Sequence, residues 1–369
     1  MNGKAAVFLG PGKGYQIEEL PIPDPEPEGI VIKVTMAGVC GTDLHFWRGD
    51  SPVFVLMANQ VGGHEMVGQV YKLGANISTD SLGRPLKEGD RVCYSYFYPC
   101  NRCYQCNKGE FTACPTKVIR QLPTISRFSG AYAEYYYLKP GGWVFKVPDE
   151  LSDEVVAPVN CALSQVTYGL SVVGVKFGDT VVVQGLGGLG LNACAVAKEM
   201  GAEYVIGIDG IPARLEAAKQ FGADLVIDMR EHTTPEARFM QVLGLTGQRC
   251  ADVVAELVGV PEAFVEGMQF VRSGGAMLEM GNISVGNAAA FDPAQLVVGS
   301  RRIYGVGTYD PWVIPEALDF LVRTRNKYPF DKIMSHKYKL EDINRAFEEA
   351  EWKAAGAEKS KITRAFIVP

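Results

Sequence analysis

Four cysteines stand close together in the first third of the chain, and their spacing fits a closed metal site. They are Cys100, Cys103, Cys106 and Cys114. Four thiolates at such short intervals can complete a tetrahedron around zinc with no open position, which is the coordination of a structural site. Four buried free thiols or a redox Cys-x-x-Cys pair are the alternatives, but a third and a fourth cysteine so near favour zinc. We therefore expect a structural zinc lobe at about 98–116.

A second set of metal-binding residue types is spread along the chain. It comprises Cys40, the neighbours His64 and Glu65, and Cys161. Two cysteines and one histidine leave a fourth zinc position for water or substrate, as in catalytic zinc sites. Each residue alone is more often part of a core, but the chain has only four histidines to compete for the role. Asp43 is a carboxylate that could orient the His64 ring.

A glycine-rich turn between a predicted strand and a predicted helix indicates a dinucleotide site. The strand TVVVQ leads into the turn, and the run LNACAVAKEMGA after it is compatible with a helix. Glycines permit the sharp turn, the approach of a pyrophosphate and close packing of the helix, whose first N–H groups attract phosphate. The turn residues expected to bind the cofactor are Gly185, Gly187, Gly188, Leu189 and Gly190. An ordinary α/β turn without ligand is the alternative.

Asp209 ends the next predicted strand, YVIGID, and favours NAD over NADP. An acid at this place suits the adenosine ribose hydroxyls and would repel a 2′-phosphate. The residues that follow it are Gly210, Ile211 and Pro212, whereas an NADP enzyme usually has a small residue followed by arginine.

The elements that must position these groups are of two kinds. Before residue 150 the chain has β-rich segments with frequent turn signals and one short helix expected after Cys40, which predicts an irregular, mostly antiparallel β domain. Beyond it, apolar strands alternate with helical patterns, which indicates a parallel sheet covered on both faces. The six expected strands are TVVVQ (180–184), YVIGID (204–209), ADLVID (223–228), ADVVAELVG (251–259), GGAMLEMGN (274–282) and RRIYGVG (301–307). Two such halves make a doubly wound fold.

Composition narrows the class of protein. The chain has 369 residues, of which 47% are hydrophobic and 21% charged, so we expect a globular protein of more than one domain. A formal net charge of −6 disfavours nucleic acid and anionic membrane as partners. The N-terminal segment has no apolar signal-peptide core, and no apolar run is read as approaching the roughly 18 residues of a membrane span. Clustered cysteines in such a chain indicate metal ligation and a cytoplasmic location.

Taken together, these motifs resemble the zinc-containing medium-chain alcohol dehydrogenases over essentially the whole chain. The matching segments are GVCGTDLH (38–45), GGHEMVGQVYKLG (62–74), KEGDRV (87–92), the four-cysteine lobe, GAYAEYYYL (130–138), APVNCALSQVTYGL (157–170), VVVQGLGGLGL (181–191) and VIGIDGIPAR (205–214). The resemblance implies an α/β fold, in which a GroES-like β-barrel catalytic domain contains an inserted Rossmann domain with a doubly wound parallel sheet. The implied boundaries are 1–162 for the catalytic part, 163–306 for the NAD-binding part and 307–369 for the return to the catalytic domain.

The resemblance also assigns roles to single residues. It implies that Cys40, His64 and Cys161 bind the catalytic zinc with Glu65 close behind, and that each chain holds two Zn²⁺ ions. Thr42 resembles the hydroxyl that takes the substrate proton, and His45 the outer end of the relay. Arg214 would lie near the adenosine ribose, and Arg364 would reach a cofactor phosphate. In this scheme zinc acts as a Lewis acid on the alcohol oxygen, and a hydride passes to or from NAD.

The substrate follows less directly from the resemblance. By family position, Trp47, Tyr96 and Asn160 would line the pocket, together with Phe46 and Tyr309. Such aromatic rings favour an apolar alcohol, cyclic, terpenoid or aromatic, although some of them could be ordinary core. The segment 115–130 departs from the short spacer usual in the family, at the border of the substrate cleft.

Several alternatives stay open at this stage. A simple alcohol or aldehyde, a glutathione adduct of formaldehyde, and reduction of an activated double bond fit the same scaffold. The polyol branch usually has glutamate as third ligand, and Cys161 therefore favours the alcohol branch. A dinucleotide-binding sensor without enzyme activity would be expected to lose a zinc ligand or Thr42, and this chain keeps them. A zinc ribbon that binds nucleic acid would need many Lys and Arg residues around its cysteines. The family predicts a homodimer or homotetramer joined through the sheet edge at 297–307.

Overall fold

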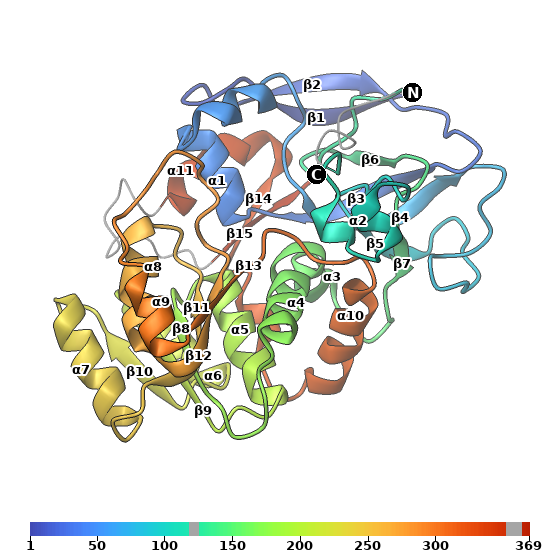
Figure 1. Ribbon diagram of the computed structural model, residues 1–369. Coiled ribbons are helices and arrows are strands. Elements are labelled where there is room, and N and C mark those ends of the chain that lie inside the picture. The colour runs from blue at the N-terminus through green and yellow to red at the C-terminus, as the bar shows by residue number, and fades with distance from the viewer. Residues whose placement is uncertain (118–124, 352–363) are drawn as a thin grey trace.

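The computed structural model describes residues 1–117, 125–351 and 364–369. Two sheets dominate it, and Figure 1 shows the elements of the first and last parts of the chain above those of the middle part. A separate antiparallel hairpin is formed by β1 (Asn2–Phe8) and β2 (Tyr15–Pro21). The expected combination of a GroES-like β domain and a Rossmann domain is confirmed.

The first sheet is drawn from both ends of the chain. Its main path runs in the order β14-β15-β3-β4-β5-β7, and β6 pairs with β3 beside this path. Its strands are β3 (Ile30–Gly38), β4 (Glu65–Leu73), β5 (Arg91–Tyr94), β6 (Tyr135–Leu138), β7 (Val144–Lys146), β14 (His336–Lys339) and β15 (Ala365–Val368). All pairs are antiparallel except β14 with β15. The expected antiparallel β domain is therefore present, and the tail completes it.

The second sheet is the expected six-stranded parallel sheet, with the order β10-β9-β8-β11-β12-β13. Its strands are β8 (Thr180–Gln184), β9 (Tyr204–Asp209), β10 (Leu225–Asp228), β11 (Ala251–Glu256), β12 (Val271–Glu279) and β13 (Arg302–Gly305). The order reverses between β8 and β11, and ligands of doubly wound sheets bind at the carboxyl ends of the strands at this switch point.

Alternate residues of the parallel strands pack against helices on opposite faces. Val181 and Val183 of β8 belong to the core beneath α4 and α5, whereas Val182 belongs to the core beneath α7 and α8. The first face carries α4 (Ser164–Val173), α5 (Gly188–Glu199), α6 (Pro212–Gln220) and α10 (Val313–Thr324), whereas α3 (Asp153–Val156) packs on β3 and β4. The second carries α7 (Pro235–Leu245), α8 (Pro261–Phe270) and α9 (Ala294–Gly299). The remaining α-helices among the described residues are α1 (Gly41–Arg48), α2 (Tyr104–Asn107) and α11 (Ile343–Ala350).

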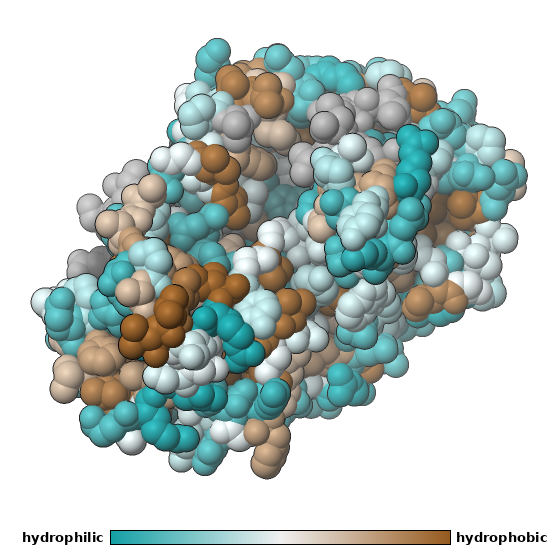
Figure 2. All heavy atoms as spheres, viewed as in Figure 1, coloured by the Kyte–Doolittle hydropathy of each residue, from teal (hydrophilic) through white to brown (hydrophobic). Residues whose placement is uncertain are grey.

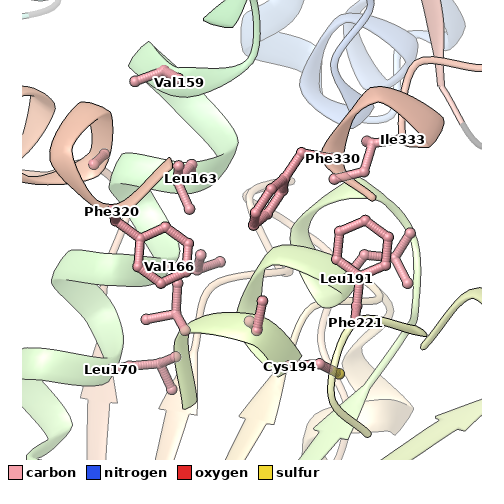
Figure 3. Packing of buried hydrophobic residues seen from close by; sticks show 14 of the residues in the cluster. Val159, Leu163, Val166, Leu170, Leu191, Cys194, Phe221, Phe320, Phe330 and Ile333 are labelled. Atoms are coloured by element: carbon pink, nitrogen blue, oxygen red, sulfur yellow. The ribbon is translucent and has the colours of Figure 1, made fainter. Parts of the chain in front are cut away.

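One helical stretch, Asp153–Val173, is long and apolar enough to cross a membrane, so the expectation that no apolar run reaches that length is wrong. In the structure, 72% of its most apolar window is buried inside the protein, which is the behaviour of a core helix. Its buried side chains, spaced three and four residues apart, pack with residues of α5 and α10 (Figure 3). Those labelled in the figure on this stretch are Val159, Leu163, Val166 and Leu170.

Candidate active site

The dispersed metal-binding residues meet at one point between the two sheets. Cys40, His64, Glu65 and Cys161 each offer a ligand atom, and these atoms all lie within 4.8 Å of one another. The Sγ atoms of Cys40 and Cys161 are 3.8 Å apart, and His64 Nε2 lies 3.3 Å from Cys161 Sγ. The structure thus brings together residues that the sequence separates by more than a hundred positions.

Strand pairing explains how two of these residues meet. β3 and β4 are antiparallel neighbours, and Gly38 at the end of β3 pairs with Glu65 at the start of β4. Cys40 and His64 therefore leave the sheet at the same edge. A Cβ atom at position 38 would come within 2.4 Å of Glu65 Oε2, so glycine is needed for the carboxyl group to lie here.

Cys161 reaches the cluster from an irregular turn of the long helix. Residues Val159–Leu163 form a π-helical turn between α3 and α4, and all five are buried. Such turns insert an extra residue into the helix and re-aim side chains, which is why they occur at functional sites. The sequence predicted the helix here but not its π turn.

Asp43 is positioned to orient the histidine. Its Oδ1 lies 3.4 Å from His64 Nδ1, and its Oδ2 accepts hydrogen bonds from the Cys40 backbone N–H at 2.9 Å and from the Tyr132 hydroxyl at 2.7 Å. Burial alone would lower the pKa of His64, but the nearby Asp43 carboxylate holds that pKa well above its ordinary value. Tyr132, in the segment GAYAEYYYL, was not singled out by the sequence, because a tyrosine in a strand gives no sign of its partner.

Glu65 carries a buried oxygen atom without a donor. Its Oε1 is paired with the Arg364 guanidinium, whereas Oε2 accepts no hydrogen bond from any described residue. Burial raises the pKa of Glu65 to about 8, although Arg364 opposes the shift. An unsatisfied buried oxygen facing two thiols and an imidazole fits a site for a divalent cation, and this donor set is the one that zinc prefers. A hydrogen bond from Cys161 lowers the pKa of Cys40, and the nearby His64 lowers it further, although burial opposes both effects.

The four cysteines of the lobe also converge, with all four ligand atoms within 4.8 Å of one another. Backbone N–H groups point at the sulfur atoms: Cys100 N lies 3.3 Å from Cys114 Sγ, and Cys103 N lies 3.3 Å from Cys100 Sγ. Burial opposes ionisation of Cys114, but the hydrogen bonds from Cys100 and Thr116 outweigh it and lower the pKa of this thiol to about 6. The N–H groups of the lobe thus stabilise cysteine thiolates, which are the form that binds zinc.

The glycine turn has the geometry that its sequence predicts. Gly185 has a φ of 84°, which favours glycine, and a Cβ atom at Gly190 would lie 1.9 Å from the Gly185 carbonyl oxygen. Gly187 caps the N-terminus of α5. Asp209 is 7% exposed and accepts backbone hydrogen bonds from Leu186 and Ile211, each at 2.8 Å. Arg214 Nη1 lies 3.7 Å from Asp209 Oδ2.

Arg364 lies between the metal-binding cluster and the glycine turn, and its contacts leave the predicted role at a cofactor phosphate as a prediction. The predicted role was a contact with a cofactor phosphate, and the structure pairs this guanidinium with Glu65 and the Val39 carbonyl. Its Nη1 atom donates to no described residue and lies only 2.9 Å from the position of a Cβ atom at Gly188. One arm of the guanidinium therefore remains directed at the glycine turn.

A single cavity of about 710 Å³ joins the glycine turn to the cysteine and histidine cluster. Its lining includes Thr42 in the first turn of α1, His45 one turn later, and the ring of Tyr96, which lies 4.9 Å from the His64 ring. The apolar part of the wall includes Phe8, Tyr15, Leu44, Phe46, Phe54, Met57, Val61 and Tyr96.

Three residues proposed for the pocket lie elsewhere. Trp47 is not part of the described cavity wall, because it turns toward α11 and its ring lies 6.1 Å from that of Phe347. Asn160 and Tyr309 are fully buried: the Asn160 side chain donates to the His64 carbonyl at 3.0 Å, and the Tyr309 hydroxyl donates to the Asn160 carbonyl. These two residues support the cluster from behind, whereas Tyr96 and Phe46 line the cavity as expected.

His45 lies where α1 meets the loops of the parallel sheet. Its Nδ1 is 2.6 Å from Asp50 Oδ2 and 3.3 Å from the hydroxyl of Ser284, in the loop after β12. On its other side, Nε2 lies 3.4 Å from the position of a Cβ atom at Gly259. Asp50 was not recognised in the sequence, although an acid five residues after a histidine at a helix end is a local signal.

Comparisons with known proteins agree with this geometry. Residues 26–149 match the family described as alcohol dehydrogenase GroES-like domain, and residues 188–323 match the family described as zinc-binding dehydrogenase. The 5-exo-hydroxycamphor dehydrogenase of Pseudomonas putida is 32% identical over 349 residues, which cover 94% of each chain. A sorbitol dehydrogenase of Bacillus subtilis is 31% identical over 354 residues, 95% of this chain and 94% of that relative.

A solved structure extends the likeness to three dimensions. The crystal structure of an alcohol dehydrogenase from Thermotoga maritima matches this chain with a TM-score of 0.89 and 27% identity, and 100% of each chain is covered. The chain belongs to the zinc-containing medium-chain alcohol dehydrogenase family, and it is a zinc-dependent oxidoreductase that interconverts an alcohol and its carbonyl compound with NAD.

Proposed function

We propose that the physiological substrate is an apolar, ring-bearing alcohol or the corresponding carbonyl compound. The observation that carries this proposal is the cavity wall next to the cysteine and histidine cluster, which is built largely from aliphatic and aromatic side chains. An apolar wall gains roughly 0.8 kcal/mol for each substrate CH₂ group that it buries. A polyol would leave several hydroxyl groups without partners against the same wall, which disfavours it.

Within this function, Cys40, His64 and Cys161 are the ligands of the catalytic zinc, and Asp43 holds the His64 ring. The unpartnered oxygen of Glu65 supports this assignment, because it places a second negative group directly behind the cluster. Zinc bound here supplies a Lewis acid for the substrate oxygen. The four-cysteine lobe binds a second, structural zinc, so that each chain holds two.

The proton of the substrate hydroxyl passes to groups of the chain itself. Thr42 lines the cavity beside Cys40 and accepts this proton, while its own proton moves toward His45. His45 is held by Asp50 and belongs to the residue type whose ordinary pKa suits proton exchange near neutral pH.

NAD binds over the glycine turn, with Asp209 and Arg214 at its adenosine end. Both oxygens of Asp209 already accept one backbone N–H, which fixes the carboxylate while each oxygen keeps a lone pair for a ribose hydroxyl. Arg364 Nη1, which donates to no residue within the described part of the chain and lies beside Gly188, supports a contact with a cofactor phosphate. Asp209→Ala should lower the ratio of kcat/KM with NAD to that with NADP by about tenfold, the value of a hydrogen bond to a charged group. An unchanged ratio would mean that the acid does not meet the ribose.

The substrate test is a panel of alcohols with one purified sample. We would follow NADH formation with bicyclic and aromatic alcohols, ethanol and sorbitol, and would count zinc per chain by elemental analysis. We expect two zinc ions per chain and a kcat/KM for the bulky apolar alcohols at least about 100-fold above that for ethanol, since several CH₂ groups become buried. Preference for sorbitol would contradict the proposal, and turnover of activated double bonds alone would replace it with a reductase.

The same proposal includes domain boundaries and assembly. We place the catalytic domain at 1–162 and 307–369 and the Rossmann domain at 163–306, which is supported by the pairing of β15 with β3. A second copy of the chain would cover the exposed edge strand β13 and the neighbouring α9, where Val297 and Val298 are 80% and 87% exposed. Figure 2 shows the brown apolar patch over α9. None of the nine cysteines, all of which the structure describes, forms a disulfide, which fits the reducing cytoplasm.

A further inference from the structure

Two acidic residues meet at the carboxyl edge of the parallel sheet. Glu256 is the last residue of β11 and Glu279 the last of β12, and the sheet register pairs them directly. Glu256 is 0% exposed, and one nitrogen atom, Nδ2 of Asn282, lies 3.1 Å from an oxygen atom of each carboxyl group. After burial itself, the strongest influences on Glu256 are the carboxyl group of Glu279 and backbone N–H groups.

The hydrogen bonds around this pair lack one donor. Glu256 Oε1 accepts from the backbone of Val258 at 2.6 Å and of Gly259 at 3.0 Å. The Asn282 side-chain amide donates to Glu256 Oε2 and to Glu279 Oε1, each at 3.1 Å. Glu279 Oε2 is buried and receives no hydrogen bond from any described residue. Two ionised carboxylates can only accept, so a proton held between them supplies the missing donor.

Both acids hold loops that border the cavity. The residues that follow Glu256, Leu257 and Val258, line the cavity, as does Gly281 after Glu279. Since Asp209 marks the adenosine end on β9, the nicotinamide half of the cofactor must lie across the switch point, over β11 and β12. The pair therefore lies directly behind the loops at the nicotinamide end.

We infer that Glu256 and Glu279 share one proton, and that this acid–carboxylate pair positions the two loops that hold the nicotinamide half of NAD. The inference rests on the proposed mode of cofactor binding. These are positioning residues: neither is part of the cavity wall, and both act through the loops and through Asn282. His45 contacts the same loops at Ser284 and beside Gly259, so the pair also fixes the place where the proton relay ends.

The charge of the pair has a definite pH dependence. Burial, assisted by the neighbouring carboxyl, raises the pKa of Glu256 to about 8. Below this pH the shared proton is present, and above it two adjacent negative charges, of which that of Glu256 is fully buried, repel each other and loosen the loops. The neighbours do not relieve this repulsion: the side chain in the same row on β8 is neutral Gln184, and the partly buried Glu266 of α8 is paired with Arg238 at 2.5 Å. Across the loop lies His45, which is in contact with Asp50 at 2.6 Å and with Arg48 at 3.3 Å.

The test is Glu279→Gln, with NADH binding to the zinc-loaded enzyme measured by fluorescence titration between pH 6 and pH 10. A glutamine can keep the bonds from Asn282 through its oxygen and donate to Glu256 through its amide, so it mimics the shared proton at every pH. We expect the variant to bind NADH within about twofold of wild type at pH 7. Above pH 8 the wild-type Kd should rise by about tenfold per pH unit and that of the variant should stay level.

Glu262→Gln, which changes an exposed acid of α8, is the matched control and should follow the wild-type curve. Identical curves for wild type and Glu279→Gln would overturn the inference, whereas absence of NADH binding at all pH values would instead overturn the proposed function. Infrared spectroscopy of the wild type gives a second readout that needs no variant. The C=O band of a protonated carboxyl should be present at pH 7 and lost above pH 8, and its absence at pH 7 would also overturn the inference.

Discussion

The two cysteine clusters of this protein differ in how the chain builds them. The lobe takes four thiols from one short segment, and its N–H to sulfur bonds are local, such as Cys103 N to Cys100 Sγ. The dispersed cluster takes its ligands from the end of β3, the start of β4 and a π-helical turn. A local cluster can close around an ion by itself, whereas the dispersed one exists only when the whole fold is assembled.

The difference extends to what surrounds each cluster. The dispersed cluster opens on the cavity, and behind it lies Glu65 Oε2, which has no hydrogen-bond partner in the described part of the chain. None of the four lobe cysteines lies in the described wall of that cavity. A metal site that keeps a coordination position open beside a cavity is suited to catalysis. A site whose four thiolates fill every coordination position is suited to stabilising the fold.

The largest expected effect on kcat comes from removing a residue of the dispersed cluster. Cys161→Ala removes a ligand of the dispersed cluster, and we expect kcat to fall at least about 1000-fold, since a catalytic metal supplies several kcal/mol and each 1.36 kcal/mol is tenfold in rate. Elemental analysis should find one zinc per chain, and NADH titration should find binding retained. Wild-type kcat in this variant would show that the ligand set is wrong.

A smaller effect is expected from the residue that holds His64. Asp43→Asn keeps the shape but weakens the contact with His64 Nδ1, and changes of this kind cost about 10–100-fold in metal affinity or activity. Competition with a chelator would measure zinc affinity site by site. Loss of zinc from the lobe rather than from the dispersed cluster would contradict the assignment of Asp43.

The smallest effect on catalysis is expected from the lobe. Cys103→Ser should leave kcat within about twofold of wild type, because the lobe does not border the cavity. Metal binding to such a site is folding energy, so we expect Tm to fall by about 5 °C, which corresponds to a few kcal/mol. A fully folded variant with unchanged Tm and no activity would reverse the comparison between the two clusters.

The sequence predicted best what neighbours in the chain can show. The glycine turn, Asp209 and the four lobe cysteines lie in short segments whose residue types fix both structure and chemistry. The pairs Asp43–Tyr132 and Glu65–Arg364 were not predicted, because their members are 89 and 299 positions apart. The pairing of Glu256 with Glu279 depends on strand register, which each strand alone does not reveal.

The residues that line the cavity were also predicted only in part. Trp47 and Tyr96 were predicted to line it on equal grounds, yet only Tyr96 is part of the described wall. Trp47 turns instead toward Phe347 of α11, an element that comes from the far end of the sequence. Which face of α1 looks into the cavity is thus decided by tertiary packing and not by the local pattern.

The pairing of β15 with β3 has a consequence for biosynthesis. β15 lies between β14 and β3, and Arg364 just before it bonds to Val39, 325 positions earlier. During translation, the first sheet therefore lacks its inner strand β15 until the ribosome has synthesised all the strands of the parallel sheet. The parallel domain can fold first as a unit. The proposed zinc ligands Cys40 and His64 emerge early, but Glu65 gains its counter-ion Arg364 only at the last step. The proposed catalytic site is therefore completed after the sheet that carries the glycine turn.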